Sequence, residues 1–333
     1  MRIVSLVPSA TEIVAALGLG DELFGISHVC DYPAAAVAGR AVVTSSLLPR
    51  AVHPADDDDE ALRDADPAQT PTAAEIHERV RAALEKGEAL YRVDTDLLRS
   101  LNPDLVITQG LCDVCAVTHQ AAVAAADAVG TGVPVLDLSP TSLMEVYATF
   151  LQVGAATGRE REAAALATSV QARWDAVRER VATVTERPRT LLLEWPDPIF
   201  SAGHWNPDLL AIAGGVGGPW DVAGEPSRVL SWEEVRAFAP EMIILIACGM
   251  DAYRALEEAY ALPDAPGWFD LPAVRNGECY AADGSAYFNR PGPRLAESAE
   301  ILATILHPET FTAMLPPYSV QRFSNDLLDP EAE

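Results

Sequence analysis

The feature that most constrains the fold of this chain is a segment that occurs twice. Leu98–Ile107 reads LRSLNPDLVI and Val235–Ile244 reads VRAFAPEMII. The arginine and the proline coincide, an acidic residue follows each proline, and the apolar positions match. Because proline disfavours helix in the residue before it, each copy predicts a helix, a stop and then a buried strand. An internal repeat of this length predicts two similar halves.

Short apolar runs alternate with helical patterns in both halves. The first strand is followed by Ser9 and, three residues later, Glu12, a spacing typical of a capping box at a helix start. The alternation predicts an α/β protein of two Rossmann-like lobes with mainly parallel sheets. The predicted strands include Ile3–Val7, Leu23–Ser27, Leu105–Thr108, Val133–Leu138 and Thr190–Glu194.

A long helical pattern joins the two halves, running from Thr141 to about Val184. Gly154 and Gly158 lie inside it and predict a bend or a short break. We therefore expect one long bridging α-helix between the lobes. The expected domains are an N-terminal lobe at 1–140 with an acidic loop insertion at about 53–71, a bridging helix at 141–186, a C-terminal lobe at 187–310 and a tail at 311–333.

Charge and hydropathy exclude several classes of partner. Lys and Arg total 23 against 49 Asp and Glu, for a formal net charge of −26. Such a field repels nucleic acid and anionic membrane surfaces, and no apolar run is long enough for direct membrane insertion. Met1–Val7 lacks the pattern of a signal peptide. We therefore expect a monomer located in the cytoplasm, or outside it if an export signal is missing from the sequence.

Sequence motifs give little support to an enzyme. No paired-carboxylate motif, phosphate-binding loop or Ser-His-Asp spacing stands out, and Lys86 is the single lysine. Schiff-base chemistry and a P-loop both lack a good candidate. We expect a binding protein with no catalytic residues.

Residues that follow the predicted strands form the candidate binding site. In open parallel sheets, ligands bind beyond the carboxyl ends of the strands, so two lobes would share a cleft between those ends. Aromatic and soft side chains dominate at these positions, which favours a large, flat, partly apolar ligand. The candidate ligand-binding residues are Ser9, His28, Cys30, Tyr32, Ser45, Gln109, Cys112, Trp195, His204, Trp205, Tyr287, Phe288 and Arg290.

Four motifs carry a resemblance to a known family. They are Arg2–Glu12 (RIVSLVPSATE), Gly25–Pro33 (GISHVCDYP), Leu101–Ile107 (LNPDLVI) and Tyr287–Arg294 (YFNRPGPR). Together they resemble the cobalamin and iron-complex substrate-binding proteins of ABC transporters, the helical-backbone class III family. The resemblance implies two lobes, one bridging helix, a small-molecule ligand in the cleft and docking on an ABC permease. Glu75 and Glu233 are candidates for the docking carboxylates, or else solvated acids at helix starts.

The resemblance implies a corrinoid, similar to cobalamin, or a related metal-tetrapyrrole as the bound ligand. Ser45 and Gln109 stand at positions where a cobalamin receptor is expected to carry tryptophan. Two alternatives remain open at this stage. The first is a protein that binds a ferric siderophore or haem, and the second is a cytosolic Cys/His metal-binding protein or enzyme on the same fold.

The cysteines allow several roles. Cys112 and Cys115 form a C-x-x-C motif with His119 four residues later, and Cys30 follows a neighbouring predicted strand. These four residues could hold zinc or another thiophilic metal. The thiols could also contact the metal of a bound ligand, form a redox pair, or be buried without a chemical role. No covalent cofactor is expected.

Overall fold

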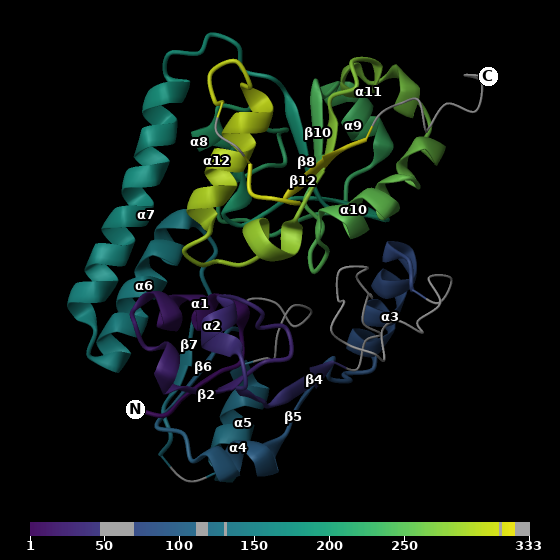
Figure 1. Ribbon diagram of the computed structural model, residues 1–333. Coiled ribbons are helices and arrows are strands. Elements are labelled where there is room, and N and C mark those ends of the chain that lie inside the picture. Colours follow the sequence, from purple (N-terminus) through teal and green to yellow (C-terminus); the bar gives the residue numbers. More distant parts are fainter. Residues whose placement is uncertain (47–69, 111–118, 130–131, 313–314, 324–333) are drawn as a thin grey trace.

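The computed structural model of the chain describes residues 1–46, 70–110, 119–129, 132–312 and 315–323. Two α/β lobes lie one above the other in Figure 1, with a long helix along one side of both. Each lobe is built on a five-stranded sheet. The expected fold class is therefore confirmed, and the sheet order shows how each lobe is built.

The N-terminal lobe contains a fully parallel sheet in the order β3-β2-β1-β6-β7. Its central strand β1 is buried throughout because both neighbouring strands and the covering helices enclose it. The strands are β1 (Ile3–Ser5), β2 (Leu23–Ile26), β3 (Ala41–Val42), β6 (Leu105–Thr108) and β7 (Val135–Asp137), and the helices are α1 (Pro8–Ala16), α2 (Ala34–Val37), α4 (Thr95–Leu101) and α5 (His119–Val129).

The C-terminal lobe has the sheet order β12-β11-β10-β8-β9, in which β8, β10 and β11 are parallel and the two edge strands are antiparallel. Edge strand β12 comes from the segment that we expected to be a tail. The strands are β8 (Thr190–Pro196), β9 (Ile199–Ser201), β10 (Met242–Leu245), β11 (Cys279–Ala282) and β12 (Val320–Arg322), and the helices are α8 (Asn206–Ala213), α9 (Trp232–Phe238), α10 (Ala252–Ala259), α11 (Pro272–Arg275), a π-helical turn (Gly284–Phe288) and α12 (Leu295–Leu306).

The segment that the sequence predicts as one long helix forms two helices, and one of them bridges the lobes. Helix α6 (Leu143–Thr157) ends at Gly158, which adopts a left-handed conformation with φ +68°, and α7 (Glu160–Val181) then runs back beside it. A Cβ on Gly154 would lie 2.4 Å from the Cβ of Ala163, so the two helices touch at this point. The break expected from the glycines is thus a full reversal of direction, and α7 alone spans the lobes.

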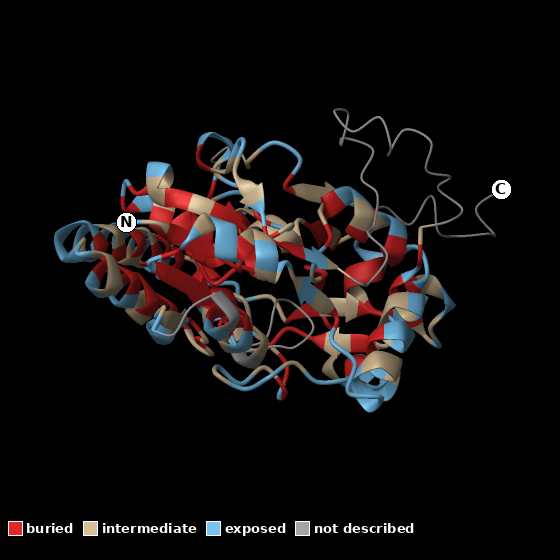
Figure 2. Cartoon of the chain, turned by 90° about the horizontal axis from the view of Figure 1, so that it is seen from below, coloured by how far each residue is buried: buried red, intermediate tan, exposed pale blue. Residues whose placement is uncertain are grey.

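Helix α7 contributes to the cores of both lobes. Ala163 and Ala167 are buried in its first half, and Trp174 and Val181 in its second half. The Trp174 indole N–H donates to the carbonyl of Leu295 in α12, at 3.0 Å. Buried side chains of both lobes and of α6 and α7 form one continuous apolar cluster, and buried residues fill the centre of each lobe in Figure 2. The lobes are therefore joined by packed core, which resists large changes in their spacing.

The start of α1 differs from the capping box that the sequence predicts. The helix begins at Pro8, whose fixed φ suits a first helical position, and the preceding Val7 provides no side-chain cap. Ser9 and Glu12 are both buried instead. The predicted Ser9 cap is wrong because the helix begins one residue before Ser9, and Glu12 pairs with arginines of the C-terminal lobe, as described below.

One part of the N-terminal lobe projects from its main sheet. Strands β4 (Thr44–Ser46) and β5 (Tyr91–Val93) form a separate antiparallel ribbon. Between them in sequence lies helix α3 (Ala73–Glu85), which begins with a capping box formed by Thr72 and Glu75. Glu75, a candidate docking carboxylate, therefore caps its own helix. Figure 1 shows α3 beside the space between the lobes, on the side away from α7. Most of the predicted acidic insertion lies outside the described residues.

Candidate ligand-binding site

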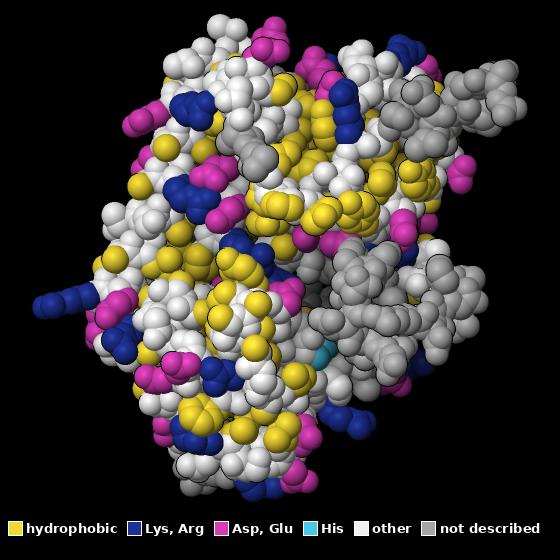
Figure 3. All heavy atoms as spheres, in the orientation of Figure 1, with side chains coloured by type: hydrophobic (Ala, Val, Ile, Leu, Met, Phe, Trp, Pro, Cys, Tyr) yellow, Lys and Arg dark blue, Asp and Glu magenta, His cyan; other side chains and the backbone are white. Residues whose placement is uncertain are grey.

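The carboxyl ends of the two parallel sheets face each other. Glu12 and Asp31 follow β1 and β2 in the N-terminal lobe, and both contact Arg290, which follows β11 in the C-terminal lobe. Figure 3 shows a recess in the surface between the lobes, bordered by acidic and basic side chains. Strand ends that meet across a crevice are the usual ligand site of open α/β sheets, so we place the candidate site here.

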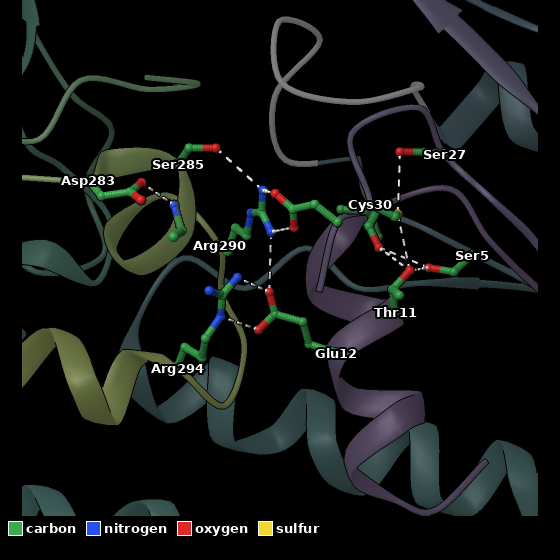
Figure 4. A network of polar contacts seen from close by, with 12 residues as sticks. Ser5, Thr11, Glu12, Ser27, Cys30, Asp283, Ser285, Arg290 and Arg294 are labelled. Carbon is green, nitrogen blue, oxygen red and sulfur yellow. Dashed lines mark hydrogen bonds and ion pairs between the residues drawn. The ribbon is translucent and has the colours of Figure 1, made fainter. Parts of the chain in front are cut away.

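Four charged side chains from the two lobes meet at this junction, and we call them the inter-lobe ion cluster: Glu12, Asp31, Arg290 and Arg294. Figure 4 shows Glu12 facing Arg290 and Arg294. Arg294 donates from Nε to Glu12 Oε2 at 3.0 Å and from Nη2 to Glu12 Oε1 at 2.5 Å. Arg290 donates to both carboxylate oxygens of Asp31, with 2.9 Å from Nη2 to Oδ2, and its Nη1 lies 3.4 Å from Glu12 Oε1. Two positive and two negative charges are thus paired across the lobes.

Burial differs sharply within the cluster. Glu12 and Arg290 are 3% and 7% exposed, whereas the Asp31 side chain is 65% exposed. Desolvation of its carboxylate beside the C-terminal lobe would raise the pKa of Asp31, but hydrogen bonds from Arg290 and the charges of Arg290 and Arg294 lower it below its usual value. For Arg290, burial would lower the pKa, but the pairing with Asp31 and Glu12 raises it. Asp31 and Arg290 are therefore charged at neutral pH, with Asp31 at the solvent side.

Two tyrosines flank the cluster. The Arg294 guanidinium lies 4.2 Å from the ring centroid of Tyr32 in the N-terminal lobe and 5.4 Å from that of Tyr287 in the C-terminal lobe. Stacking of a guanidinium on aromatic faces is attractive. The Tyr32 side chain remains 47% exposed, so its ring contributes apolar surface at the rim of the junction.

Cys30 is buried in a small polar network rather than presented to the recess. Its Sγ accepts a hydrogen bond from Thr11 Oγ1 at 3.1 Å and lies 3.5 Å from Ser27 Oγ, and Thr11 Oγ1 also lies 2.8 Å from Ser5 Oγ (Figure 4). Burial raises the pKa of the Cys30 thiol above its ordinary value. The protonated thiol is a weak metal ligand and a weak nucleophile.

The other candidates of the N-terminal lobe fall in different environments. His28 Nδ1 lies 2.7 Å from Thr44 Oγ1, and its ring is 5.6 Å from that of Tyr91, so it contacts the β4–β5 ribbon. Ser45 is exposed on β4, opposite Arg92, and Gln109 is buried at the end of β6. Ser9 is buried beside the C-terminal lobe, where a Cβ on Gly292 would lie 3.7 Å from its Cα.

The aromatic candidates of the C-terminal lobe divide between core and rim. Phe288 is fully buried, and Trp205 is 5% exposed and donates its indole N–H to the Phe288 carbonyl at 2.7 Å, so both are part of the core. Tyr287 and Trp195 are half-buried at the junction. His204 has a positive φ of 57°, and burial lowers its imidazole pKa. A neutral imidazole can donate to or accept from a ligand, or bind a metal.

The proposed metal-binding set is only partly described. Cys112 and Cys115 lie outside the described residues, and His119 is the first residue of α5, with its side chain not described. Within the described ranges, no three His, Cys, Asp or Glu side chains are arranged to hold a metal ion. The metal site of Cys30, Cys112, Cys115 and His119 therefore stays a prediction.

Sequence reasoning missed three of the four residues in the inter-lobe ion cluster. The sequence pattern predicts Glu12 as a capping residue, and Asp31 and Arg294 lie in motifs that assign them no individual role. The available signal is position: Glu12 lies in the helix that follows β1, Asp31 follows β2, and Arg294 is the N-cap of α12. Opposite charges at matching edges of the two lobes would have predicted the pairing.

Comparison with known proteins agrees with this architecture. Residues 3–286 match the family model described as periplasmic binding protein. A curated relative, 25% identical over 321 residues, covering 93% of this chain and 81% of its own length, is the uncharacterized ABC transporter substrate-binding lipoprotein YvrC of Bacillus subtilis (strain 168).

Solved structures with the same fold cover nearly the whole chain. The haem-binding protein RhuT of Roseiflexus sp. RS-1 is 24% identical with a TM-score of 0.65, covering 93% of this chain and 98% of its own. The vitamin B12-binding protein BtuF of Vibrio cholerae is 21% identical with a TM-score of 0.61, covering 92% and 96%. At these identities the likeness shows the fold.

The expected cytoplasmic location is wrong. The curated relative is a substrate-binding lipoprotein and the matching family is one of periplasmic proteins, which act outside the cytoplasm. The expectation depended on Met1–Val7. These residues contain β1 and end at the N-cap of α1, so their apolar pattern reflects a strand and carries no information on location. Within the described part of the chain, no helix has the length and apolar character needed to cross a membrane.

The two facing lobes, the spanning helix α7 and the family match over residues 3–286 agree with one another. The chain belongs to the periplasmic binding protein family, the non-enzymatic solute-binding proteins that deliver small molecules to ABC permeases.

Proposed function

We propose that this protein binds a metal-tetrapyrrole, a corrinoid or a haem, in the recess between its lobes and delivers it to an ABC permease. The observation that carries the proposal is the pair Tyr32 and Tyr287, one from each lobe, which flank Arg294 at the junction of the strand ends. Aromatic rings contributed by both sides of a crevice suit a large flat ligand, since each ring adds apolar contact area at little entropic cost.

Related proteins support the ligand class. Neighbours of the same fold are described as binding vitamin B12 and haem. Both ligands are broad macrocycles that carry a metal at the centre. His28 follows β2 in the N-terminal lobe and His204 follows β9 in the C-terminal lobe, and a neutral imidazole is suited to contact such a metal. The corrinoid is our leading ligand, and haem is the runner-up within the same class.

Ferric siderophores form the contrasting candidate. Such ligands are usually anionic and call for several arginines that lack a protein partner. Arg290 and Arg294 are both paired with carboxylates, and Arg228 pairs with Glu234 at 2.7 Å. The described part of the junction therefore offers an anion little uncompensated positive charge.

Calorimetric titration tests the proposal. Purified protein is titrated separately with cyanocobalamin, dicyanocobinamide, haemin and ferric enterobactin, an anionic siderophore complex. We expect saturable one-to-one binding of at least one tetrapyrrole and none of ferric enterobactin. A Tyr32→Ala variant should weaken tetrapyrrole binding, and Tyr147→Ala, at a half-buried tyrosine on α6, serves as the matched control. No heat with any tetrapyrrole, or tight binding of ferric enterobactin alone, would overturn the ligand class.

A further inference from the structure

Helix α3 belongs to the N-terminal lobe by sequence but is anchored to the C-terminal lobe. The backbone N–H of Ala73, its first residue, donates to Glu258 Oε2 at 3.0 Å, and the Ala73 carbonyl accepts from the Trp195 indole at 3.2 Å. Arg254 Nη2 donates to the Pro71 carbonyl at 2.9 Å. Three side chains of the C-terminal lobe thus bind the first turn of α3.

Apolar contacts reinforce this anchor. Ala73 is fully buried in the core cluster of the C-terminal lobe, and Ile76 packs against the same cluster. The His77 ring lies 5.8 Å from that of Phe200 on β9. Glu258 is 7% exposed and pairs with Arg254 on the same face of α10. A buried carboxylate that accepts a helix N-terminal N–H is a strong attachment, because both its charge and its hydrogen-bonding capacity are satisfied there.

The rest of α3 is loosely held. Of its thirteen residues, only Ala73 and Val80 are buried. On the side of the N-terminal lobe, a cavity of about 800 Å³ separates the second half of α3 from β5 and α5, lined by residues such as Arg79, Ala83, Tyr91 and Ala124. A helix with few buried contacts and open space beside it opens at low free energy. Among the described residues, the first turn is therefore the main attachment that holds α3 across the junction.

We propose that α3 is a releasable clasp, closed by Glu258, Arg254 and Trp195, whose detachment widens the way into the recess for a ligand. Helix α3 lies beside the space between the lobes, on the side away from α7 (Figure 1), and its first turn ties the two lobes together there. Detachment exposes the Trp195 indole, which α3 covers in the closed form. The clasp itself does not depend on which ligand binds; its effect on ligand kinetics rests on the proposed function.

Hydrogen exchange of the ligand-free protein tests the clasp directly. We expect Glu258→Ala to raise the exchange rate of the α3 amides about tenfold, because a charge-assisted hydrogen bond to the helix is lost. Glu257→Ala is the matched control, since Glu257 also pairs with Arg254 but is exposed and does not contact α3. The control should change exchange by less than about twofold. If Glu258→Ala does not fold, Glu258→Gln, which keeps the shape and one acceptor, should change exchange in the same direction by about threefold.

Stopped-flow binding of haemin and cyanocobalamin supplies the second readout. Glu258→Ala should raise the rates of ligand association and dissociation by about the same factor as the hydrogen-exchange rate of the α3 amides. The reason is that ligand entry is limited by the fraction of molecules in which α3 is detached. Unchanged α3 exchange in both Glu258 variants overturns the clasp, as does faster exchange with unchanged ligand rates. If neither ligand binds to wild-type protein, the proposed function fails, and the exchange result still decides whether the clasp exists.

Discussion

At the residue scale, the inter-lobe ion cluster depends on one buried carboxylate. Glu12 accepts hydrogen bonds from both Arg290 and Arg294, and its 3% exposure leaves it little access to water. A buried charge pair is not a large net source of stability, but removing one partner leaves the other uncompensated. The cluster therefore acts mainly to fix which surfaces of the two lobes meet.

Substitution of Glu12 should be far more damaging than substitution of Asp31. We expect Glu12→Ala to lower the free energy of unfolding by about 3–5 kcal/mol, because two arginines at a buried junction lose this carboxylate partner. Asp31→Ala should cost no more than about 1 kcal/mol, because its side chain is 65% exposed. Urea denaturation of both variants measures the difference. Equal losses in the two variants would show that burial does not decide the energetics of this cluster.

Asp221 should make stability fall as the pH rises. Burial raises the pKa of this carboxyl to about 7, against which the N–H of Gly218 and the charge of Arg228 act in the opposite direction. Its Oδ2 accepts from Gly218 at 2.8 Å, while Oδ1 is buried without a partner among the described residues. Between about pH 4 and 7 the folded state keeps the proton that the unfolded state has lost, so deprotonation favours unfolding.

Asp221→Asn removes the loss of folding stability that deprotonation of Asp221 causes. The variant should match wild type near pH 4 and be more stable above pH 7 by at least about 1 kcal/mol. Urea midpoints measured at half-unit pH intervals test this, with Asp270→Asn, an exposed carboxylate that pairs with Arg275, as control. A difference that does not change with pH would contradict the assignment.

At the scale of elements, the reversal between α6 and α7 decides how the lobes are joined. The left-handed Gly158 ends α6, and the absence of a side chain on Gly154 lets Ala163 of α7 approach α6 closely. Because α7 then packs on α6 at one end and on α12 at the other, it belongs to both cores at once. The spacing of the lobes is set by this packing.

A double-mutant cycle tests that contact. Gly154→Ala should destabilise the protein by about 1–2 kcal/mol through overpacking against Ala163, despite the better helix propensity of alanine. Adding Ala163→Gly should recover at least about 1 kcal/mol of the loss expected from the two single changes. Gly158→Ala, which meets no atom within 4 Å but has a positive φ, should be destabilising without coupling to Ala163. Additive losses for positions 154 and 163 would contradict the close approach.

The sequence patterns were sufficient to locate helices and strands, but they did not predict which of these elements pack against one another. The apolar runs located β1, β2, β6 and β8, and the repeat around Pro103 and Pro240 identified the two lobes, because hydrophobic periodicity is a local property. The direction of α7 after Gly158 and the attachment of α3 to the opposite lobe depend on contacts between residues far apart in the chain. For the same reason Trp205 and Phe288, chosen for the site by their place after strands, lie in the core.

At the scale of the whole molecule, three features connect the two lobes. Helix α7 runs along one side of both, the inter-lobe ion cluster pairs charges between them, and α3 lies on the side away from α7. Such a frame restricts relative motion of the lobes, so ligand access depends more on a small element than on a hinge. A receptor of this kind presents nearly the same outer surfaces to a permease with and without ligand.

The location of the bound metal tests the central claim most directly. Crystals grown with haemin or cyanocobalamin can be measured at the iron or cobalt absorption edge, where the metal gives an anomalous difference peak. We predict one strong peak per chain in the recess between the carboxyl ends of β1, β2 and β6 and those of β8, β10 and β11. A peak on an outer surface of either lobe, or a saturated complex with no metal between the lobes, would contradict the account.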